Sequence, residues 1–309
     1  MNTPEKPAVL LSHVMLAPLQ GALDGEYEVL RRWEEPELSQ VRAIVHAGEF
    51  KLEPAFLESM PKLGLIACVS VGYDGVPVDW CRDHRVAVTH SVGLNADDVA
   101  DVAVGLLIGA WRGTVEGDRR LREGRWTHAD RMRPRHSLGG RKAGIVGLGH
   151  IGEAVARRLE ALRMEVSWWG PNAKAAAWPR AGSLLTLAKD CDVLVVCCRA
   201  DASNRHLISQ EVIEALGPRG CLVNVARGSL VDEDALIDAL KDGRLGMAAL
   251  DVYETEPTPP ERWADVPNTV LTPHMAGGTL ESIPQMVGQT LENLRRFFAG
   301  EPLATPIGA

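Results

Sequence analysis

The sequence lacks the features that would place the chain across a membrane, on an export route or on nucleic acid. No apolar run approaches the roughly 20 residues that a membrane-spanning helix needs. The N-terminal segment MNTPEKPAVLLSHV has no basic region followed by an apolar stretch, so we expect no secretion signal. The net charge is −8, the pI is about 5.6 and no basic stripe is visible, which argues against a nucleic-acid partner.

Cysteine is scarce and shows no metal-binding spacing. The chain has six cysteines, none of them in a C-x-x-C pair: Cys68, Cys81, Cys191, Cys197, Cys198 and Cys221. Four of the six lie in or at the end of apolar, strand-like runs, which predicts buried and reduced thiols. We therefore expect a cytoplasmic protein with neither a disulfide framework nor a metal site.

The composition is that of an ordinary globular protein, and apolar strands alternate with helices along the chain. The 309 residues are 46% hydrophobic and 24% charged, which suits about two domains with sizeable cores. The first third carries five short apolar runs, Ala8–Met15, Tyr27–Trp33, Arg42–His46, Leu63–Val71 and Arg85–Thr89. Helical or loop segments separate them, and this spacing predicts a parallel sheet covered on both faces.

A second alternating series follows a long helix expected at Asn95–Trp111, with Asn95 as its N-cap. Strand–helix alternation at this spacing is typical of a doubly wound sheet. The strands are expected at Ala143–Val146, Glu165–Trp169, Val193–Cys198, Cys221–Val225, Ala248–Asp251 and Thr269–Leu271. The last helix, Glu281–Phe298, is expected to return to the first domain. The fold class is therefore α/β, with two doubly wound parallel-sheet domains, residues 1–95 with 280–309 and residues 96–279, and a cleft between them.

The charged stretch Arg112–Arg135, which holds Trp126, is too irregular to assign to one structure. It could be an arm over a partner subunit, a lid near the cleft or a solvated connection. The sequence leaves these alternatives open.

The stretch 144–159, GIVGLGHIGEAVARRL, joins the end of a strand to a helix through three glycines. Gly147, Gly149 and Gly152 have G-x-G-x-x-G spacing, and the apolar residues that follow fall on one helical stripe. The first glycine permits a sharp turn, the second lets the backbone approach a pyrophosphate, and the third allows close packing of helix on strand. The positive end of the helix then faces the phosphates. The context predicts dinucleotide binding; the alternative is a glycine-rich turn in an unrelated α/β unit.

Polar residues follow three successive strands of the second series, where ligands bind in a doubly wound sheet. They are Arg227, Glu256 and His274. Taken singly, they could be a surface ion pair, an exposed turn residue and a structural histidine. Together they supply what hydride transfer to a 2-keto acid needs. These requirements are a cation for the carboxylate, an acid for the developing alkoxide, and a carboxylate that favours the charged imidazole.

At this point the sequence resembles the D-2-hydroxyacid dehydrogenase family, in its glyoxylate/hydroxypyruvate reductase branch. The resemblance spans nearly the whole chain. The segments that carry it are VGYDGV (71–76), the GLGHIG turn, NVARGSLVDEDAL (224–236), ALDVYETEP (249–257) and TPHMAGG (272–278). It implies a flavodoxin-like substrate domain at residues 1–95 and 280–309, and a Rossmann dinucleotide-binding domain at residues 96–279.

The resemblance also implies a role for individual residues. Arg227 binds and polarises the substrate, His274 is the acid/base, and Glu256 is its carboxylate partner. Asp251 contacts the nicotinamide carboxamide, and the N–H groups of Val71 and Gly72 hold the substrate carboxylate. The other residues assigned to the cofactor are Val99, Gly147, Gly149, His150, Ile151, Gly152, Trp169, Gly170, Asn172, Lys174, Cys198, Arg199, Val225, Ala226 and Gly277. The adenosine-side loop at Cys198 and Arg199 lacks the proline that is usual in the family.

The cofactor preference can be argued from an absent carboxylate. NAD enzymes place an acid about 20 residues past the glycine turn to hold the ribose 2′-OH. No Asp or Glu occurs between Glu165 and Asp190, and Gly170 stands where NAD-using members of the family carry the acid. Asn172 and Lys174, with His150, can bond to a 2′-phosphate, so we predict NADP(H), with NAD(H) also possible. Many members of the branch carry an arginine near Asn172, and this chain does not.

The predicted function is NADPH-dependent reduction of glyoxylate and hydroxypyruvate to D-2-hydroxy acids. Two alternatives remain. The same fold can act on another anion or 2-keto acid, such as phosphoglycerate, formate, phosphite or an aromatic pyruvate. A loop near His46–Phe50 is expected to form part of the pocket that selects the substrate side chain. The second is a dinucleotide-sensing corepressor without catalysis. By resemblance, the partners are a small keto or hydroxy acid and a second copy of the chain, with the Asn95–Trp111 helix and its successor at the dimer interface.

Overall fold

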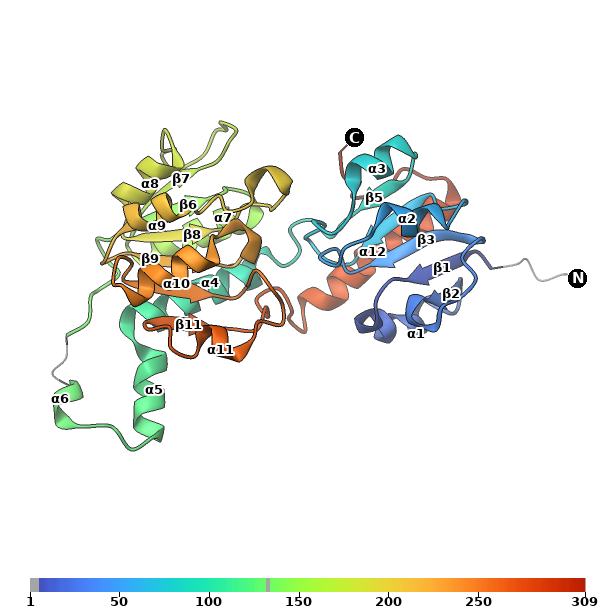
Figure 1. The fold of residues 1–309 in the computed structure, drawn as a ribbon. Coiled ribbons are helices and arrows are strands. Elements are labelled where there is room, and N and C mark those ends of the chain that lie inside the picture. The colour runs from blue at the N-terminus through green and yellow to red at the C-terminus, as the bar shows by residue number, and fades with distance from the viewer. Residues whose placement is uncertain (1–5, 132–133, 309) are drawn as a thin grey trace, which may run out of the picture. The chain divides into compact units, whose positions relative to one another are not determined.

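The computed structural model describes residues 6–131 and 134–308. The chain divides into two compact units (Figure 1). Unit 1 comprises Met1–Leu94 and Thr279–Ala309, and unit 2 comprises Asn95–Gly278. Asn95 and Thr279 therefore lie on the other side of the boundary from where the sequence analysis puts them.

Unit 1 contains a five-stranded parallel sheet with the order β2-β1-β3-β4-β5. This order is that of flavodoxin-like folds, in which the chain reverses direction across the sheet after its second strand. The strands are β1 (Ala8–Leu11), β2 (Glu28–Arg31), β3 (Val41–His46), β4 (Leu65–Cys68) and β5 (Ala87–Thr89). The helices are α1 (Gln20–Leu23), α2 (Pro54–Glu58), α3 (Val78–Asp83) and α12 (Ser282–Ala299).

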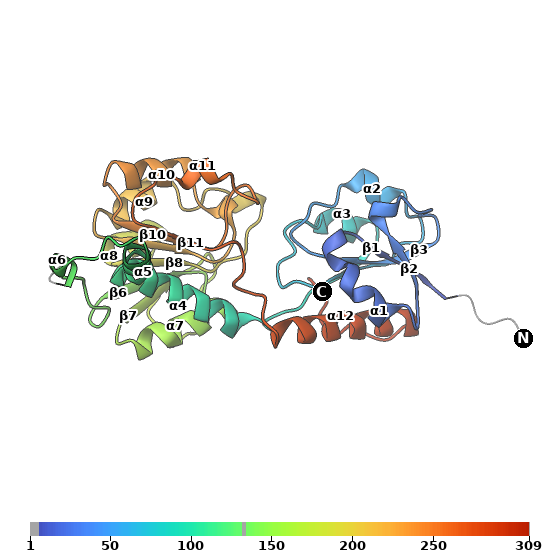
Figure 2. The ribbon, with the colours of Figure 1, turned by 90° about the horizontal axis from the view of Figure 1, so that it is seen from below.

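Both faces of the unit 1 sheet are buried, as its continuous apolar strands predict. Alternate residues of β1 enter different cores: Leu10 packs with Ile44 on one face, and Val9 packs on the other. Leu294 of α12 is fully buried in the second core. Figure 2 shows α12 on the face opposite α2 and α3. The C-terminal helix thus completes the core of the N-terminal sheet.

Unit 2 contains a six-stranded parallel sheet with the order β11-β10-β9-β8-β6-β7. The strands are β6 (Lys142–Val146), β7 (Glu165–Trp169), β8 (Val193–Val196), β9 (Cys221–Asn224), β10 (Met247–Leu250) and β11 (Thr269–Leu271). The helices are α4 (Ala96–Arg112), α5 (Thr114–Arg122), α6 (His128–Arg131), α7 (His150–Ala161), α8 (Leu184–Asp190), α9 (Gln210–Leu216), α10 (Glu233–Lys241) and α11 (Pro260–Trp263). The order reverses between β6 and β8, and ligands bind at the carboxyl ends of strands beside such a point.

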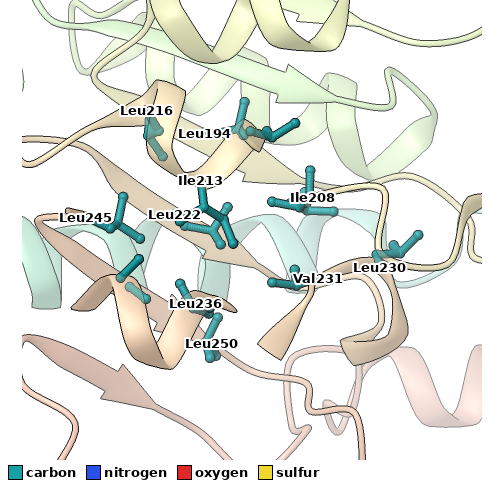
Figure 3. Close-up of a cluster of buried hydrophobic side chains, with 14 of the residues drawn as sticks. Leu194, Ile208, Ile213, Leu216, Leu222, Leu230, Val231, Leu236, Leu245 and Leu250 are labelled. Atoms are coloured by element: carbon teal, nitrogen blue, oxygen red, sulfur yellow. The ribbon is translucent and has the colours of Figure 1, made fainter. Parts of the chain in front are cut away.

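Helices cover both faces of the unit 2 sheet. Ile145 and Val195 point to the core beneath α4 and α7. Leu194 and Leu222 point to the opposite core, where Leu236 of α10 meets them (Figure 3). Figure 2 shows α4 and α7 on one face and α9 and α10 on the other. The predicted fold class, two doubly wound parallel sheets, is confirmed.

The stretch Arg112–Arg135 contains two helices that stand out from the rest of unit 2, α5 and α6 (Figure 1). None of the residues of α5 is buried. Leu121 and Trp126 are each 57% exposed. Residues 132 and 133 of this stretch lie outside the described residues.

Several predicted elements end earlier in the structure. The first strand ends at Leu11, and a 3₁₀ helix, Val14–Leu19, follows it. The strand expected at 193–198 ends at Val196. No helix in the described ranges is long and apolar enough to cross a membrane. All six cysteines are unpaired thiols.

Candidate active site and dinucleotide-binding turn

The three glycines between β6 and α7 have different surroundings. Gly147 has φ +90°, and a Cβ there would lie 2.5 Å from the Cα of Cys198. A Cβ at Gly152 would lie 2.1 Å from the carbonyl oxygen of Gly147. A Cβ at Gly149 would meet nothing within 4 Å. Two glycines are therefore required by close packing, and the third borders open space that a pyrophosphate can enter.

The first turn of α7 is suited to bind that pyrophosphate. Gly149 occupies the N-cap position and offers no side chain to the N–H groups of the turn. Uncapped N–H groups and the helix dipole attract phosphate oxygens. A pyrophosphate therefore fits the turn both sterically and electrostatically.

Arg227 follows β9 on a turn that its neighbours fix. The Asn224 side chain accepts a hydrogen bond from the Ala226 N–H (3.1 Å) and donates one to the Arg227 carbonyl (2.9 Å). A Cβ at Gly228 would lie 1.8 Å from the carbonyl carbon of Tyr253. The loop after β9 thus lies directly against the loop after β10, and only glycine at position 228 permits the two backbones to come this close.

Glu256 and His274 form a close pair. The distance between His274 Nδ1 and Glu256 Oε2 is 2.6 Å. Glu256 Oε1 accepts the N–H of Tyr253 at 2.9 Å. Partial burial alone would raise the pKa of Glu256, but the hydrogen bonds from His274 and Tyr253 and the charges of His274 and Arg227 outweigh it and lower that pKa. Glu256 is therefore ionised at neutral pH and stabilises a positive charge on the His274 ring.

Asp251 organises the turn that carries His274. Its carboxylate is buried and accepts hydrogen bonds from the Thr272 hydroxyl (2.5 Å) and from the N–H groups of Met275 (3.0 Å) and Ala276 (2.9 Å). Its backbone carbonyl accepts the N–H of His274 at 2.8 Å. These bonds hold His274 at φ +49°, an uncommon conformation for a residue other than glycine. The predicted contact with a nicotinamide carboxamide stays a prediction, beside this structural role.

On the adenosine side, Gly170 directly follows β7, and His150 and Asn172 are exposed. Lys174 Nζ lies 2.6 Å from Glu153 Oε1 on α7, a pairing that the sequence did not indicate. Arg199 pairs with Asp201 at 3.1 Å.

Asn95 has surroundings that are unusual for a helix cap. Asn95 is at the N-cap position of α4, but its side chain makes no capping hydrogen bond. Its Oδ1 is buried without a partner in the described part of the chain. A Cβ at Gly277 would lie 2.4 Å from Asn95 Nδ2 and 3.7 Å from Val99 Cγ2. Asn95 thus adjoins two residues predicted to contact the cofactor; its pattern in sequence was that of an ordinary helix cap.

In unit 1, the carbonyl groups of the predicted substrate loop are held by side chains. His90 Nδ1 donates to the Val71 carbonyl at 2.9 Å, and Ser70 Oγ donates to the Gly72 carbonyl at 2.7 Å. A Cβ at Gly48 would lie 2.0 Å from that same Gly72 oxygen. Across residues 6–131 and 134–308, the N–H groups of Val71 and Gly72 have no acceptor. They remain available to an anion.

The structure brings Arg227, Glu256 and His274 together at the carboxyl ends of β9, β10 and β11 in unit 2. Val71 and Gly72 lie in unit 1, and their contribution to substrate binding stays a prediction. Within the described ranges, no group of three or more His, Cys, Asp or Glu side chains could hold a metal ion.

Comparison with known proteins gives consistent matches. Residues 104–276 match the family described as D-isomer specific 2-hydroxyacid dehydrogenase, NAD binding domain. The chain is 37% identical over 312 residues to a hydroxyphenylpyruvate reductase of Plectranthus scutellarioides, covering 98% of this chain and 99% of that protein. It is 35% identical over 312 residues to glyoxylate/hydroxypyruvate reductase A of Arabidopsis thaliana, with the same coverage.

Among solved structures, the chain is similar to an NADPH-dependent glyoxylate/hydroxypyruvate reductase of Sinorhizobium meliloti in complex with NADP and malonate. The TM-score is 0.90, the sequence identity is 32%, and the match covers 98% of this chain and 97% of that one.

Proposed function

The chain belongs to the D-isomer specific 2-hydroxyacid dehydrogenase family, and we propose that it reduces small 2-keto acids to D-2-hydroxy acids with NADPH. The family uses a nicotinamide dinucleotide. The observation that carries the proposal is the 2.6 Å pair of His274 and Glu256, with the charge of Arg227 acting on the same carboxylate. An acid, its partner and a cation are what the reaction requires of the protein.

The residues of unit 2 divide the work of reduction. The reduced nicotinamide, when bound, supplies a hydride to the carbonyl carbon of the substrate. Arg227 binds the substrate carboxylate and polarises the carbonyl group. His274 gives a proton from Nε2 to the carbonyl oxygen, because its Nδ1 is engaged by Glu256. Glu256 holds the ring in place and favours its protonated form before transfer.

The proposed dinucleotide site is the glycine turn of unit 2, with the pyrophosphate at Gly149 and the first turn of α7. Unit 2 is then the dinucleotide-binding domain and unit 1 the substrate domain. NADPH preference is supported by the absence of a carboxylate at Gly170. The Sinorhizobium meliloti relative is NADPH-dependent by name.

Glyoxylate and hydroxypyruvate are the first candidate substrates, because the Arabidopsis relative is named for both. The Plectranthus relative, at 37% identity, favours hydroxyphenylpyruvate as a second candidate. The test is the rate of NADPH oxidation with glyoxylate, hydroxypyruvate and hydroxyphenylpyruvate, compared by kcat/KM. If the protein turned over none of the three keto acids, the proposal would be contradicted. The ranking of the three kcat/KM values shows what size of substrate side chain the site prefers.

Two variants test the assignment of residues. His274→Ala should lower kcat by at least about a hundredfold, the usual scale for loss of a general acid. Arg227→Ala should raise KM for the keto acid while leaving the Kd for NADPH unchanged, as measured by fluorescence titration. Retained turnover in both variants would remove this site from the mechanism.

A homodimer is also part of the proposal. Its support is that α5 buries none of its residues and that Val115, Leu121 and Trp126 are all at least half exposed. Exposed apolar residues on a projecting segment are typical of a contact surface.

A further inference from the structure

Arg180 lies at the outer edge of the unit 2 sheet. The Trp168 N–H donates to the Pro179 carbonyl at 3.0 Å, and the Ala181 N–H donates to the Trp168 carbonyl at 2.8 Å. These bonds form a parallel bridge between Trp168 and Arg180. Because β7 is the edge strand, the bridge places Arg180 one strand further out, beside the carboxyl end of β7.

The Arg180 side chain is directed along that strand to its end. Nη2 donates to the Gly170 carbonyl at 2.7 Å and lies 3.4 Å from the Pro171 carbonyl. The guanidinium carbon is 5.7 Å from the centre of the Trp168 ring. A guanidinium therefore stands at Gly170, where the sequence analysis finds the carboxylate of NAD-using enzymes missing.

The charge of Arg180 is available to a ligand, whereas that of Lys174 is not. Lys174 is already paired with Glu153 at 2.6 Å. Arg180 contacts no carboxylate within residues 6–131 and 134–308, and its Nε and Nη1 have no acceptor there. A guanidinium binds phosphate through two parallel hydrogen bonds, which an ammonium cannot do.

We propose that Arg180 binds the 2′-phosphate of NADPH and thereby sets the cofactor preference of this chain. The inference rests on the proposed use of NADPH at the glycine turn. Arg180 takes the place of the arginine that is missing near Asn172. It lies ten residues after Gly170 in the sequence, and its side chain reaches the same strand end. The 2′-phosphate of NADPH then faces a guanidinium whose charge no carboxylate offsets. The uncharged 2′-hydroxyl of NADH gains little binding free energy from the same guanidinium.

The test is direct binding of two fragments, 2′,5′-ADP and 5′-AMP, measured by calorimetry on the full chain. Wild-type protein should bind 2′,5′-ADP more tightly than 5′-AMP. Arg180→Gln should weaken 2′,5′-ADP by at least about tenfold, the scale of one lost charged hydrogen bond, and leave 5′-AMP unchanged. Lys174→Gln should have a smaller effect on 2′,5′-ADP. The charge-matched control is Lys189→Gln, because α8 ends just before β8 begins, at the amino ends of the strands, whereas Arg180 lies beside the carboxyl end of β7.

The outcomes separate this inference from the proposed function. Equal binding of both fragments by the wild type would contradict the proposed NADPH preference itself. Wild-type discrimination that survives in Arg180→Gln would overturn the role of Arg180 alone. If the variant loses affinity for both fragments together and its melting temperature falls, Arg180 merely anchors the 170–180 loop, and the inference is wrong.

Discussion

At the scale of the residue, the chemistry of the site depends on how one carboxylate is held. Glu256 is bound through both oxygens, one to His274 and one to the N–H of Tyr253. Its pKa is lowered by these bonds and by Arg227, against the effect of burial. The carboxylate therefore stays charged through the neutral range and favours the imidazolium that reduction consumes.

Glu256→Gln should shift the pH dependence of reduction rather than abolish turnover. Reduction needs the protonated His274, so kcat/KM falls as the pH rises. Without the negative charge, the imidazolium is less stable, and the alkaline limb should move to lower pH. The measurement is the pH profile of kcat/KM for glyoxylate. Glu254→Gln removes a nearby charge that pairs with Arg205 and His206 instead; an identical shift in this control would contradict the assignment.

A second residue-scale prediction concerns His46 in unit 1. His46 is buried, with Nδ1 2.7 Å from the Ser12 hydroxyl and Nε2 2.9 Å from the Phe50 carbonyl. Burial lowers the pKa of His46 to about 4, although the Phe50 carbonyl opposes this effect. The unfolded chain, at the ordinary value of 6.5, takes up a proton that the folded chain refuses until the pH nears 4.

Stability should therefore be lost as the pH falls from about 6.5 to about 4, by on the order of 3 kcal/mol from this group. The measurement is the urea midpoint at a series of pH values. His46→Gln keeps polar atoms at the site, and its urea midpoint should depend less on pH than that of the wild type. His84→Gln, at an exposed position, is the control and should keep the pH dependence of the wild type. Parallel curves for the wild type and His46→Gln would exclude His46 as the cause.

At the scale of the element, the sequence predicted strands well where a strand is apolar and ends at a polar residue or a turn. β7 and β11 have the predicted bounds, Glu165–Trp169 and Thr269–Leu271. The strand at 193 was predicted two residues too long because Cys197 and Cys198 are also apolar. In the structure, Gly147 packs against Cys198 and the ladder ends at Val196. Such an end is set by a tertiary contact that periodicity does not contain.

The same distinction applies to the candidate site. Arg227, Glu256 and His274 were accessible to sequence reasoning, because each lies in the loop that follows a strand and the carboxyl ends of parallel strands meet at one side of the sheet. Arg180 was not, because it reaches Gly170 from an irregular segment through a single bridge. Neither was the Lys174–Glu153 pair, whose partners lie on different elements.

The glycine turn offers an element-scale prediction with two opposite outcomes. Gly152→Ala places a Cβ 2.1 Å from a backbone oxygen, so it should destabilise unit 2 by about 1–3 kcal/mol. Gly149→Ala meets no atom, so its melting temperature should stay unchanged while the Kd for NADPH rises at least about tenfold, or about 1.4 kcal/mol. Gly288→Ala, in open space on α12, is the control for both. Normal NADPH affinity in Gly149→Ala would show that the pyrophosphate does not bind at Gly149.

At the scale of the whole molecule, the remaining prediction concerns assembly. A stable dimer interface buries about 1,200–2,000 Å² in total and is rich in aromatic and apolar side chains. In unit 2, α5 and the segment after it form a projecting arm (Figure 1). Leu121 and Trp126 on this arm are each 57% exposed. We expect sedimentation to give a dimer at micromolar concentration. The double variant Leu121→Glu/Trp126→Glu should shift it toward monomer, because each carboxylate would have to be desolvated in the interface.

The matched control for this assembly prediction is Val14→Glu. Val14 is 56% exposed but belongs to unit 1 and is not part of the α5 arm, so its substitution adds a carboxylate at an equally exposed apolar position and should leave the dimer intact. A wild type that sediments as a monomer would contradict the dimer outright. A double variant that remains dimeric would place the interface on another surface, because two buried carboxylates at its centre cost more than rim contacts supply.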